Sequence, residues 1–267
     1  MTEPSSPENQ PADPFVLIDS ANGVTTLTLN RPARYNVLSE EMLAALQQAI
    51  DNVNDDERVV VIKASGKAFC AGHDLMQMSQ HADQAYHNAL FKTCSHFMNS
   101  LLDIKQPVIA QVNGIATAAG CQLVANCDLA IASDQSRFAV SGIDIGLFCS
   151  TPSVPLSRNL SRKRAFEMLM TGEFIDANKA QEWGLLNHVV TVDELDNAVQ
   201  TLANKIIEKS AVAVATGKGL FYKQLEMPLE RAYKLAGETM ACNMMAEDVT
   251  EGIDAFKEKR SAIWRHR

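Results

Sequence analysis

Two stretches of this sequence combine small residues with the ends of apolar runs, and together they could stabilise a negatively charged oxygen. The first covers residues 69–75 and the second covers residues 113–123. In each stretch, alanine and glycine join a strand-like run to a helix-like run, where a backbone N–H can be left free and aimed at a ligand. Two such groups that converge on one carbonyl oxygen form an oxyanion hole, which stabilises charge that appears only during reaction.

The second stretch also contains an exception. Gln122 stands where such an arrangement would most usefully carry an acid. A glutamine can hold a water molecule by hydrogen bonds, but it cannot exchange a proton with that water at a useful pKa. Two groups further along the chain could act instead. Asp144 could transfer a proton or simply cap a helix, and Cys149 could be a nucleophile of lowered pKa or an inert buried thiol.

These groups need a regular framework, and the first part of the chain predicts strands that alternate with helices. Residues 15–19 and 24–29 are β-rich runs, and the Asn-Gly pair between them predicts a hairpin turn. Apolar residues then recur at helical spacing over residues 40–50. Ser39, directly before them, is expected to be the N-cap of that helix.

The rest of the chain predicts further buried strands and then a helical end. Short apolar runs at 59–62, 108–112 and 128–132 are typical of buried parallel strands. Residues 76–103 look helical but polar, and residues 117–126 predict a helix of small residues. Further helices are expected at 155–171, 176–183, 192–209, 211–223, 227–246 and 248–259. This pattern predicts an α/β protein whose helical end packs on the core or on another subunit.

Length and composition describe an ordinary globular protein. Its 267 residues are 46% hydrophobic and 21% charged, enough to bury a substantial core in one large domain or two small ones. The net charge of −8 argues against nucleic acid or an anionic membrane as the main partner. No apolar run is long enough to span a membrane. A phosphorylated ligand stays compatible, because a local basic patch or a helix N-terminus can bind one.

The cysteines and histidines indicate neither disulfides nor a metal site. The six cysteines lack CxxC spacing and the six histidines are scattered, so we expect reduced, mostly buried thiols and no bound metal. Residues 1–14 are polar and proline-rich, and they contain no Lys or Arg. They resemble neither a secretory signal nor a basic transit peptide. We therefore expect a disordered leader over residues 1–14 and a cytoplasmic protein.

The order and spacing of these motifs resemble the enoyl-CoA hydratase/isomerase (crotonase) superfamily from about residue 15 to the C-terminus. Each motif alone is weak, and the complete set carries the resemblance. The matching residues are Leu29-Asn30-Arg31-Pro32 with Asn36 and Leu38, residues 69–75, residues 106–110 with Asn113-Gly114, residues 120–123 with Cys127-Asp128, Thr171-Gly172 with Ala177 and Ala180, residues 183–187, and Glu251-Gly252 with Phe256 and residues 258–260.

The resemblance implies a crotonase-like α/β fold. Residues 15–200 would form a spiral of repeated ββα units, and residues 201–267 would form a helical C-terminal region that mediates homotrimers, often paired into hexamers. The implied ligand or substrate is an acyl-CoA thioester, with no permanently bound cofactor. The implied nominal activity is that of an enoyl-CoA hydratase or isomerase of fatty acid metabolism.

Carried over position by position, the resemblance also implies site residues. The oxyanion-hole N–H groups fall on Ala71 and Ala119. The CoA-binding positions fall on Ala33, Arg34 and Tyr35, on Ala71, Gly72, His73, Asp74 and Leu75, and on Lys259 and Trp264. His73 could contact the pantetheine arm or be a satisfied polar side chain beside Asp74. The basic, aromatic C-terminus could pack near the nucleotide of a neighbouring subunit or be a solvated tail.

The sequence departs from the family wherever the family carries a catalytic acid. Gln122 and Gly142 replace the two glutamates of a typical hydratase, and Ser150 replaces the aspartate of some isomerases and dehalogenases. Hydration needs one group that takes a proton from water and one that protonates the α-carbon, and losing either costs about 10²–10⁴ in rate. An oxyanion hole alone is worth about 3–4 kcal/mol. We therefore expect hydratase activity to be weak or absent.

Three functions stay open at this point. The chain could be an acyl-CoA enzyme that stabilises an enolate-like or tetrahedral anion. It could also be a non-catalytic acyl-CoA-binding or scaffold oligomer, or a thioester hydrolase that uses water held by Gln122. Acyl chain length would depend on pocket shape, with Met76, Met78, Phe91, Phe97 and Phe148 as the expected contributors. The run of residues 147–152 is typical of one subgroup of the family.

Overall fold

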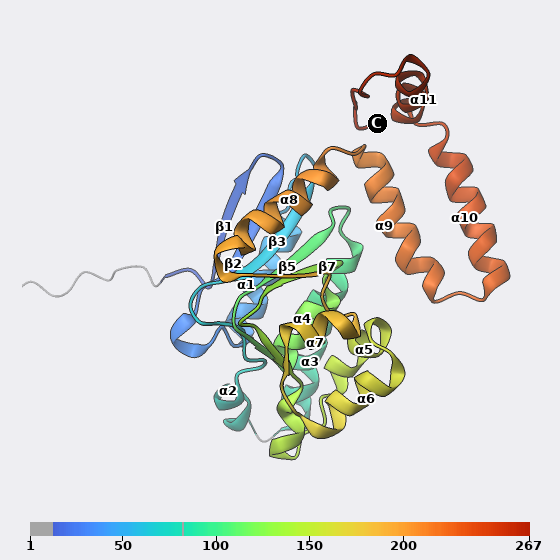
Figure 1. Cartoon of the computed structure of the whole chain (residues 1–267). Coiled ribbons are helices and arrows are strands. Elements are labelled where there is room, and N and C mark those ends of the chain that lie inside the picture. Colours follow the sequence, from blue (N-terminus) through green and yellow to red (C-terminus); the bar gives the residue numbers. More distant parts are fainter. Residues whose placement is uncertain (1–12, 82) are drawn as a thin grey trace, which may run out of the picture.

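The computed structural model describes residues 13–81 and 83–267, and it shows two β-sheets enclosed by helices with a helical end that extends from them (Figure 1). Most of the leader expected at residues 1–14 lies outside the described residues. In the described ranges no helix is both long and apolar enough to cross a membrane. The same ranges contain no cluster of three or more His, Cys, Asp or Glu side chains that could bind a metal ion.

The chain enters the fold through the predicted hairpin. Its strands β1 (Val16–Ala21) and β2 (Val24–Leu29) pair antiparallel. Asn22 and Gly23 in the turn have φ of 54° and 77°. A two-residue turn of this left-handed kind needs positive φ, which asparagine and glycine adopt at low cost. The hairpin prediction is confirmed.

The larger sheet continues from the hairpin as a parallel sheet. Its strand order is β1-β2-β3-β5-β7-β10, and each pair after the hairpin is parallel. The three strands predicted from apolar runs are confirmed, because strands covered on both faces read as continuous apolar sequence. The added strands are β3 (Val59–Ala64), β5 (Val108–Val112), β7 (Leu129–Ser133) and β10 (His188–Val190).

A smaller sheet of short strands accompanies the larger one. Its order is β4-β6-β8-β9. β4, β6 and β8 each follow closely after a strand of the larger sheet and lead towards a helix, which produces repeated ββα turns and confirms the expected spiral. Runs this short carry too little periodicity to be predicted. These strands are β4 (Ala68–Cys70), β6 (Ile115–Thr117), β8 (Arg137–Ala139) and β9 (Ile175–Asp176).

Helices pack against the sheets and against each other around a common apolar core. Ser39 caps α1 (Glu40–Asp51) as predicted, because its side chain accepts a hydrogen bond from Met42 N at 3.2 Å. Phe69, Phe97 and Phe138 are among the largest fully buried side chains of this core. The helices of this part are η1 (Pro32–Arg34), α1 (Glu40–Asp51), α2 (Leu75–Ser79), α3 (Gln84–Asp103), α4 (Ala119–Asn126), η2 (Ser141–Ile145), α5 (Ser150–Asn159), α6 (Arg162–Thr171) and α7 (Ala177–Trp183).

Two of the long predicted helices are each divided in two. The helix expected over 76–103 becomes α2 and α3, because Asp74 and Asp83 each cap a separate helix start with their carboxylates. The helix expected over 155–171 becomes α5 and α6, with Leu160 in an extended conformation between them. Single caps and extended linking residues of this kind do not disturb the apolar period, so the pattern could not show them.

The C-terminal region is helical, as expected. Its elements are η3 (Val192–Glu194), α8 (Leu195–Ile207), α9 (Ala211–Leu225), α10 (Leu229–Asn243) and α11 (Glu247–Glu258). The boundary expected at residue 200 falls inside α8, whose apolar face packs on the larger sheet. We therefore propose to place the boundary after α8.

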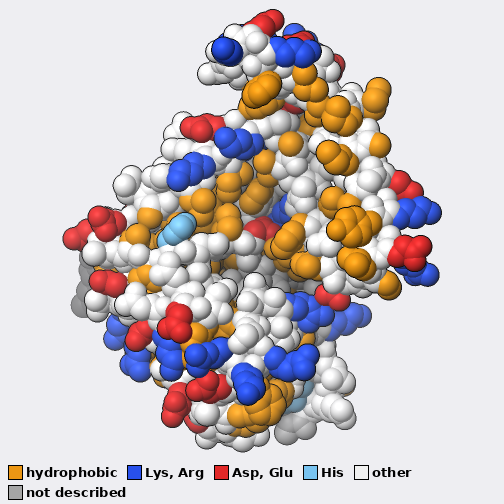
Figure 2. All heavy atoms as spheres, turned by 45° about the vertical axis from the view of Figure 1, so that its right-hand side comes forward, with side chains coloured by type: hydrophobic (Ala, Val, Ile, Leu, Met, Phe, Trp, Pro, Cys, Tyr) orange, Lys and Arg blue, Asp and Glu red, His pale blue; other side chains and the backbone are white. Residues whose placement is uncertain are grey.

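The hairpin of α9 and α10 projects from the body of the molecule, and α11 lies beyond it (Figure 1). Hydrophobic side chains gather along this hairpin on the face shown in Figure 2. The exposed hydrophobic side chains of α9 and α10 include Phe221, Leu225, Leu229, Tyr233 and Met240. An apolar surface of this extent is typical of an interaction site.

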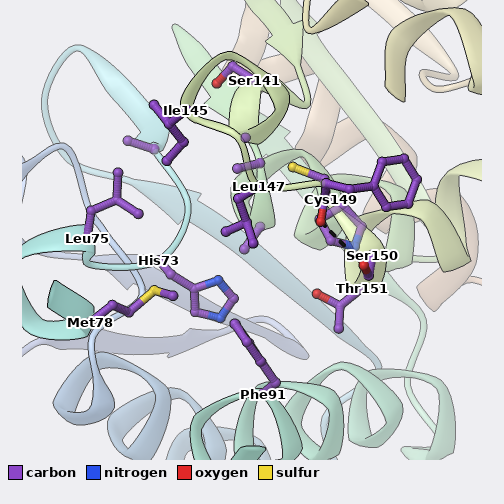
Figure 3. Close-up of a pocket in the computed structure, with 16 residues that line it drawn as sticks. His73, Leu75, Met78, Phe91, Ser141, Ile145, Leu147, Cys149, Ser150 and Thr151 are labelled. Carbon is purple, nitrogen blue, oxygen red and sulfur yellow. Dashed lines mark hydrogen bonds between the residues drawn. The ribbon is translucent and has the colours of Figure 1, made fainter. Parts of the chain in front are cut away.

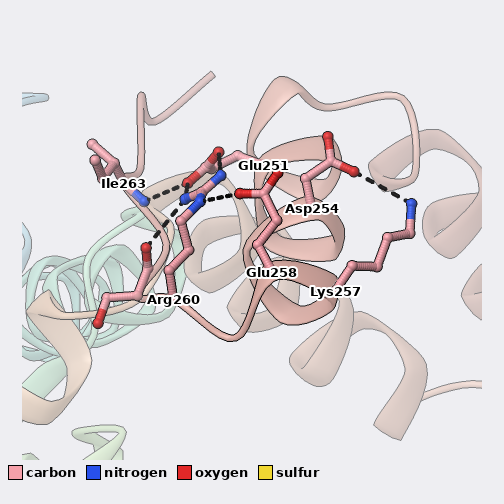
Figure 4. A network of polar contacts seen from close by, with 7 residues as sticks. Glu251, Asp254, Lys257, Glu258, Arg260 and Ile263 are labelled. Carbon is pink, nitrogen blue, oxygen red and sulfur yellow. Dashed lines mark hydrogen bonds and ion pairs between the residues drawn. The ribbon is translucent and has the colours of Figure 1, made fainter.

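The last residues fold back on α11 and do not form a solvated tail. Glu251 accepts two hydrogen bonds from the Arg260 guanidinium, at 2.6 and 3.0 Å, and one from Ile263 N (Figure 4). These bonds lower the pKa of Glu251 to about 2. Trp264 lies against the same helix at Gly252, and its indole N–H donates to Glu208 O.

Candidate active site

The two small-residue stretches pack directly against one another. Each contact is made at a glycine, because a side chain there would overlap the other stretch. A Cβ on Gly72 would lie 2.9 Å from the Cβ of Ala118 and 3.2 Å from Ala119 N, and a Cβ on Gly120 would lie 2.1 Å from Cys70 O. The end of β4 and the start of α4 are therefore in backbone contact. An oxyanion hole built from one N–H of each stretch requires this contact.

The start of α4 presents one free N–H to this junction. Ala118 has φ 50° and ψ −121°, in a region that favours glycine, and it forms the N-cap. Its own N–H donates to Ala139 O at 3.1 Å. Ala119 is the first residue of the helix, and no group in the described chain accepts its N–H. First-turn N–H groups lack intrahelical partners and carry the positive end of the helix dipole.

In the first stretch, residues 69–75, the N–H of Ala71 was expected to be free, but it is not. Ala71 N donates to Tyr35 O at 3.0 Å, so the prediction that Ala71 supplies a hole donor was wrong. Two residues on, His73 forms a parallel bridge with Leu38, whose N–H donates to Gly72 O at 2.8 Å. This pairing turns the His73 N–H away from Leu38. No acceptor for the His73 N–H is found within residues 13–81 and 83–267.

A cavity of about 280 Å³ opens at the junction and is lined by both His73 and Ala119. Figure 3 shows its wall, built from the β4–α2 turn, α3, η2 and the start of α5. Most of the wall is apolar, so charge that develops inside would be poorly screened by water. The main apolar side chains are Leu75, Met78, Phe91, Leu147, Phe148 and Pro152.

The predicted shape-determining residues divide between this cavity and other places. Met78, Phe91 and Phe148 line the cavity, as expected. Phe97 is fully buried in the core, and Met76 faces a different hollow. Leu147 and Thr151 were missed as wall residues, although they belong to the run of residues 147–152 that the sequence already marked as unusual.

The imidazole of His73 points to the middle of the labelled wall residues in Figure 3. Its ring lies edge-on to Phe91, with ring centres 5.4 Å apart. The Nε2 atom is shielded from solvent and has no hydrogen-bond partner in the described parts of the chain. Burial lowers the pKa of His73 to about 4, so the ring is neutral near pH 7.

The three positions at which the resemblance implies an acid are not equivalent in the structure. Gln122 is only 4% exposed, and its Oε1 has no partner among described residues. It follows Ala119 by three positions, on the same side of α4. Ser150 lines the cavity at the start of α5, where its hydroxyl donates to Phe148 O at 3.3 Å.

The Gly142 position offers no room for a carboxylate. A Cβ there would lie 2.6 Å from Leu147 O and 2.7 Å from the Cys149 sulfur. The Cys149 thiol is directed at Val140 O, at 3.5 Å, and burial raises its pKa. Space beside a missing glutamate is thus filled by a protonated, unreactive thiol.

Asp144 does not take the place of the missing acids. It is exposed in η2, and its carboxylate oxygens lie beside Gly172, where a Cβ would be 3.1 Å from both. It is not one of the residues that line the cavity. The interpretation of Asp144 as an ordinary loop acid fits this position.

The proposed CoA-binding positions fall into three groups. Ala71, His73 and Leu75 line the cavity. Arg34 and Asp74 line a second hollow on the other side of the β4–α2 turn and form an ion pair of 2.9 Å. Asp74 also caps α2. Lys259 and Trp264 follow α11, which ends the projecting C-terminal region (Figure 1), and neither is among the residues that line the two hollows. A single chain does not bring Lys259 and Trp264 to the other positions.

The chain is similar to known proteins over nearly its whole length. A family model described as enoyl-CoA hydratase/isomerase matches residues 19–267. The protein named enoyl-CoA hydratase domain-containing protein 3, mitochondrial, from Rattus norvegicus is 43% identical over 265 residues, which cover 98% of this chain and 88% of the relative. Its Homo sapiens counterpart is 45% identical over 247 residues, which cover 92% of this chain and 82% of the relative.

Solved structures agree with these sequence relatives. The crystal structure of an enoyl-CoA hydratase from Mycobacterium smegmatis is 54% identical with a TM-score of 0.93, covering 94% of this chain and 99% of the other. The crystal structure of human enoyl-CoA hydratase domain-containing protein 3 is 44% identical with a TM-score of 0.91, covering 94% and 100%. The subgroup to which the run of residues 147–152 pointed is that of the second protein.

One prediction is overturned by the same relatives. Enoyl-CoA hydratase domain-containing protein 3 from rat, frog, mouse and human carries the word mitochondrial in its name. The expectation of a cytoplasmic protein was therefore wrong. It depended only on the composition of residues 1–14, and targeting segments are not part of the fold that the remaining sequence encodes.

Proposed function

The chain belongs to the enoyl-CoA hydratase/isomerase family, and on that basis we propose that it binds an acyl-CoA thioester and stabilises an anion formed at the thioester carbonyl. One observation carries the proposal. The N–H groups of His73 and Ala119 have no acceptor in the described chain, and both residues line one apolar cavity where their turns are in backbone contact. Two donors fixed in this way suit an oxygen that gains charge during reaction.

The rest of the cavity supports an acyl group as the occupant. Its apolar wall of Leu75, Met78, Phe91 and Phe148 would take hydrocarbon, while the carbonyl oxygen points at the two donors. The second hollow, beyond the β4–α2 turn, would follow the CoA arm. The Arg34 side chain there is 58% exposed despite its pairing with Asp74, which leaves it accessible to a phosphate.

The missing acids limit the reaction. Gln122, Gly142 and Ser150 do not titrate, and none of the described residues that line the cavity carries a carboxylate. We therefore propose that the chain forms an enolate-like or tetrahedral anion without efficient addition of water. The same observation favours a second candidate, a protein that binds acyl-CoA without turning it over.

We also propose that the chain works as a homotrimer or hexamer assembled through its helical end. The apolar face of α9 and α10 is exposed in the single chain, with Leu229 and Tyr233 each 74% exposed. Burying such a face against another copy would be favourable by about 25 cal/mol per Å² of apolar surface. Association would also be the way to bring Lys259 and Trp264 near the CoA hollow of a neighbouring subunit.

The test is mass spectrometry of a panel of acyl-CoA and 2-enoyl-CoA esters incubated with the protein in heavy water. It detects water addition, thioester cleavage and α-proton exchange together. We expect exchange above the no-enzyme control and little hydration. Hydration at rates typical of the family would contradict the proposal, and binding without any change of any ester would favour the second candidate.

A variant that lacks one of the two N–H donors tests whether the activity depends on the oxyanion hole. Ala119→Pro deletes the N–H at the first position of α4, and circular dichroism must show that the variant is folded, because Ala118 before it lies outside the extended conformation that favours a following proline. We expect a loss of about 10²–10³ in rate. Arg162→Pro is the matched control, because it places proline at the first position of α6, outside the cavity, after a residue with a compatible backbone conformation.

A further inference from the structure

We propose that this site selects acyl-CoA esters with a long, unsubstituted hydrocarbon chain, and that Ile145 and Leu147 on the rim of the cavity set this preference. The inference rests on the proposed function, because it needs a thioester whose carbonyl oxygen lies at the His73 and Ala119 N–H groups. It adds the class of the acyl group to that function and names the residues that recognise it.

The thioester carbonyl divides a bound ester into two arms that leave it on different sides. The CoA arm would follow the β4–α2 turn to the second hollow, which Arg34 and Asp74 line. The acyl chain starts on the other side of the carbonyl carbon and must follow the rest of the cavity wall. That wall belongs mainly to α3, η2 and the η2–α5 segment, residues 145–149 (Figure 3). We therefore expect the acyl chain to contact α3 and the η2–α5 segment.

The size of the cavity favours a long chain. An apolar protein cavity of about 150 Å³ is large enough to bind benzene, which has six carbon atoms. The cavity of this protein, at about 280 Å³, has room for roughly twice as many. A four-carbon acyl group would leave much of the apolar wall in contact with water, whereas a longer chain would cover it.

Large apolar side chains continue from the cavity to the molecular surface at its rim. Ile145 is 61% exposed and Leu147 is 45% exposed, and both line the cavity. In Figure 3 these two side chains lie across the cavity from Phe91 of α3. Exposed apolar side chains that are continuous with a cavity are typical of a binding groove. Methylene groups that extend beyond the interior would therefore lie against Ile145 and Leu147.

The polar groups of the wall do not suit an acyl chain that carries a charge or a hydroxyl. None of the described residues that line the cavity is lysine or arginine, so a carboxylate on the acyl chain would be buried without a cation. The Ser141 hydroxyl forms a hydrogen bond of 2.9 Å with that of Thr117. The Ser150 hydroxyl donates to Phe148 O. The chain that fits this wall is thus plain hydrocarbon.

The experiment measures binding of butyryl-, octanoyl- and dodecanoyl-CoA to the whole chain by calorimetry, below the concentrations at which the longer esters form micelles. Each methylene group that the wall covers should tighten binding by about twofold to fourfold. The heat-capacity change of binding should become more negative with chain length, which marks burial of apolar surface. Succinyl-CoA, with as many acyl carbons as butyryl-CoA, should bind about tenfold more weakly than butyryl-CoA.

A double variant tests whether the rim sets the preference. Ile145→Ser combined with Leu147→Ser should weaken binding of dodecanoyl-CoA by about tenfold or more and leave binding of butyryl-CoA within about twofold of the original. Both side chains are exposed, so we expect the variant to fold, and circular dichroism checks this. Phe166→Ser is the matched control and should change neither affinity, because Phe166 is an exposed apolar residue of α6 that does not line the cavity.

The outcomes separate this inference from the proposed function. Equal affinities for butyryl- and dodecanoyl-CoA would overturn the inference and leave the proposed binding intact, whereas absence of binding by every ester would overturn both. An increase with chain length that the double variant keeps, or an equal loss with Phe166→Ser, would overturn the role of Ile145 and Leu147. The length series needs no variant, so the chain-length preference is tested even if the double variant folds poorly.

Discussion

At the scale of single residues, the positions where the family carries catalytic acids hold residues that do not titrate. At one of them, neighbouring atoms fill the space that an acid would need. Gly142 is the clearest case, because a Cβ there would lie 2.6 Å from Leu147 O and 2.7 Å from the Cys149 sulfur. An acid could not be restored there without moving the loop between η2 and α5. The surrounding backbone, and not only the identity of residue 142, therefore excludes the second glutamate.

This packing predicts the result of enlarging residue 142. Gly142→Ala should lower the free energy of unfolding by about 1–3 kcal/mol, because the new methyl group must displace a backbone carbonyl. Urea unfolding followed by circular dichroism measures the change. Gly142→Glu should likewise fail to create hydratase activity in a crotonyl-CoA assay, and a gain of activity would show that the loop yields easily.

The buried ring of His73 predicts a pH dependence of stability. Its pKa falls from 6.5 to about 4 on folding, so between these values the unfolded chain binds more protons than the folded one. The contribution of the neutral ring to the free energy of unfolding is complete above pH 6.5 and is lost as the pH falls towards 4. The total loss is at most about 3 kcal/mol. Urea midpoints at pH 7 and pH 4.5 should differ less in His73→Gln than in the original chain. Equal differences in both would contradict a buried neutral ring.

At the scale of elements, the site depends on how closely α4 approaches β4. Gly120→Ala would place a methyl group 2.1 Å from Cys70 O and force the two elements apart. We expect a loss of about 3 kcal/mol or more in unfolding free energy, together with weaker acyl-CoA binding. Gly219→Ala in α9 is the matched control, since a Cβ there meets nothing within 4 Å, and it should be neutral or slightly stabilising.

A buried ion pair attaches α9 to the body of the molecule. Lys218 Nζ donates to Asp128 Oδ2 at 2.7 Å and to the carbonyls of Leu101 and Gln106, and Tyr222 OH donates to Asp128 Oδ1. Both charged side chains are nearly inaccessible. The pair therefore couples the projecting hairpin to strands that lie near the site.

Removal of that lysine should be costly. Lys218→Met leaves Asp128 buried without its cation, and we expect unfolding free energy to fall by about 3–5 kcal/mol. Thermal and urea unfolding measure the loss, and Lys223→Met, an exposed change on the same helix, should stay within about 0.5 kcal/mol. A small effect of Lys218→Met would mean that water or a neighbouring group replaces the ammonium.

At the scale of the whole molecule, the exposed hairpin predicts association. Tyr233→Glu and Leu229→Glu would place charge on the apolar face of α10 and should convert the oligomer to smaller species. Sedimentation velocity measures the mass directly. An unmodified chain that sediments as a monomer at micromolar concentration would contradict assembly through this face.

Local patterns by themselves determined much of this protein. The hairpin at Asn22-Gly23, the Ser39 cap, the buried strands and the helical end follow from turn chemistry and from periods of two or 3.6 residues, which neighbouring residues encode. The absence of acids at 122, 142 and 150 was also readable, because residue identity needs no coordinates. The short strands, and the breaks that separate α2 from α3 and α5 from α6, carry too few residues to leave such a period.

Only the tertiary structure decided which backbone and side-chain groups of residues 69–75 and 113–123 face a ligand. Whether Ala71 or His73 presents a free N–H depends on Tyr35 and Leu38, which reach the turn from a distant part of the chain. The same holds for the burial of the His73 ring against Phe91 and for the closed space at Gly142. Hydrogen-bond partners and dielectric surroundings are properties of three-dimensional neighbours, so a one-dimensional pattern does not specify them.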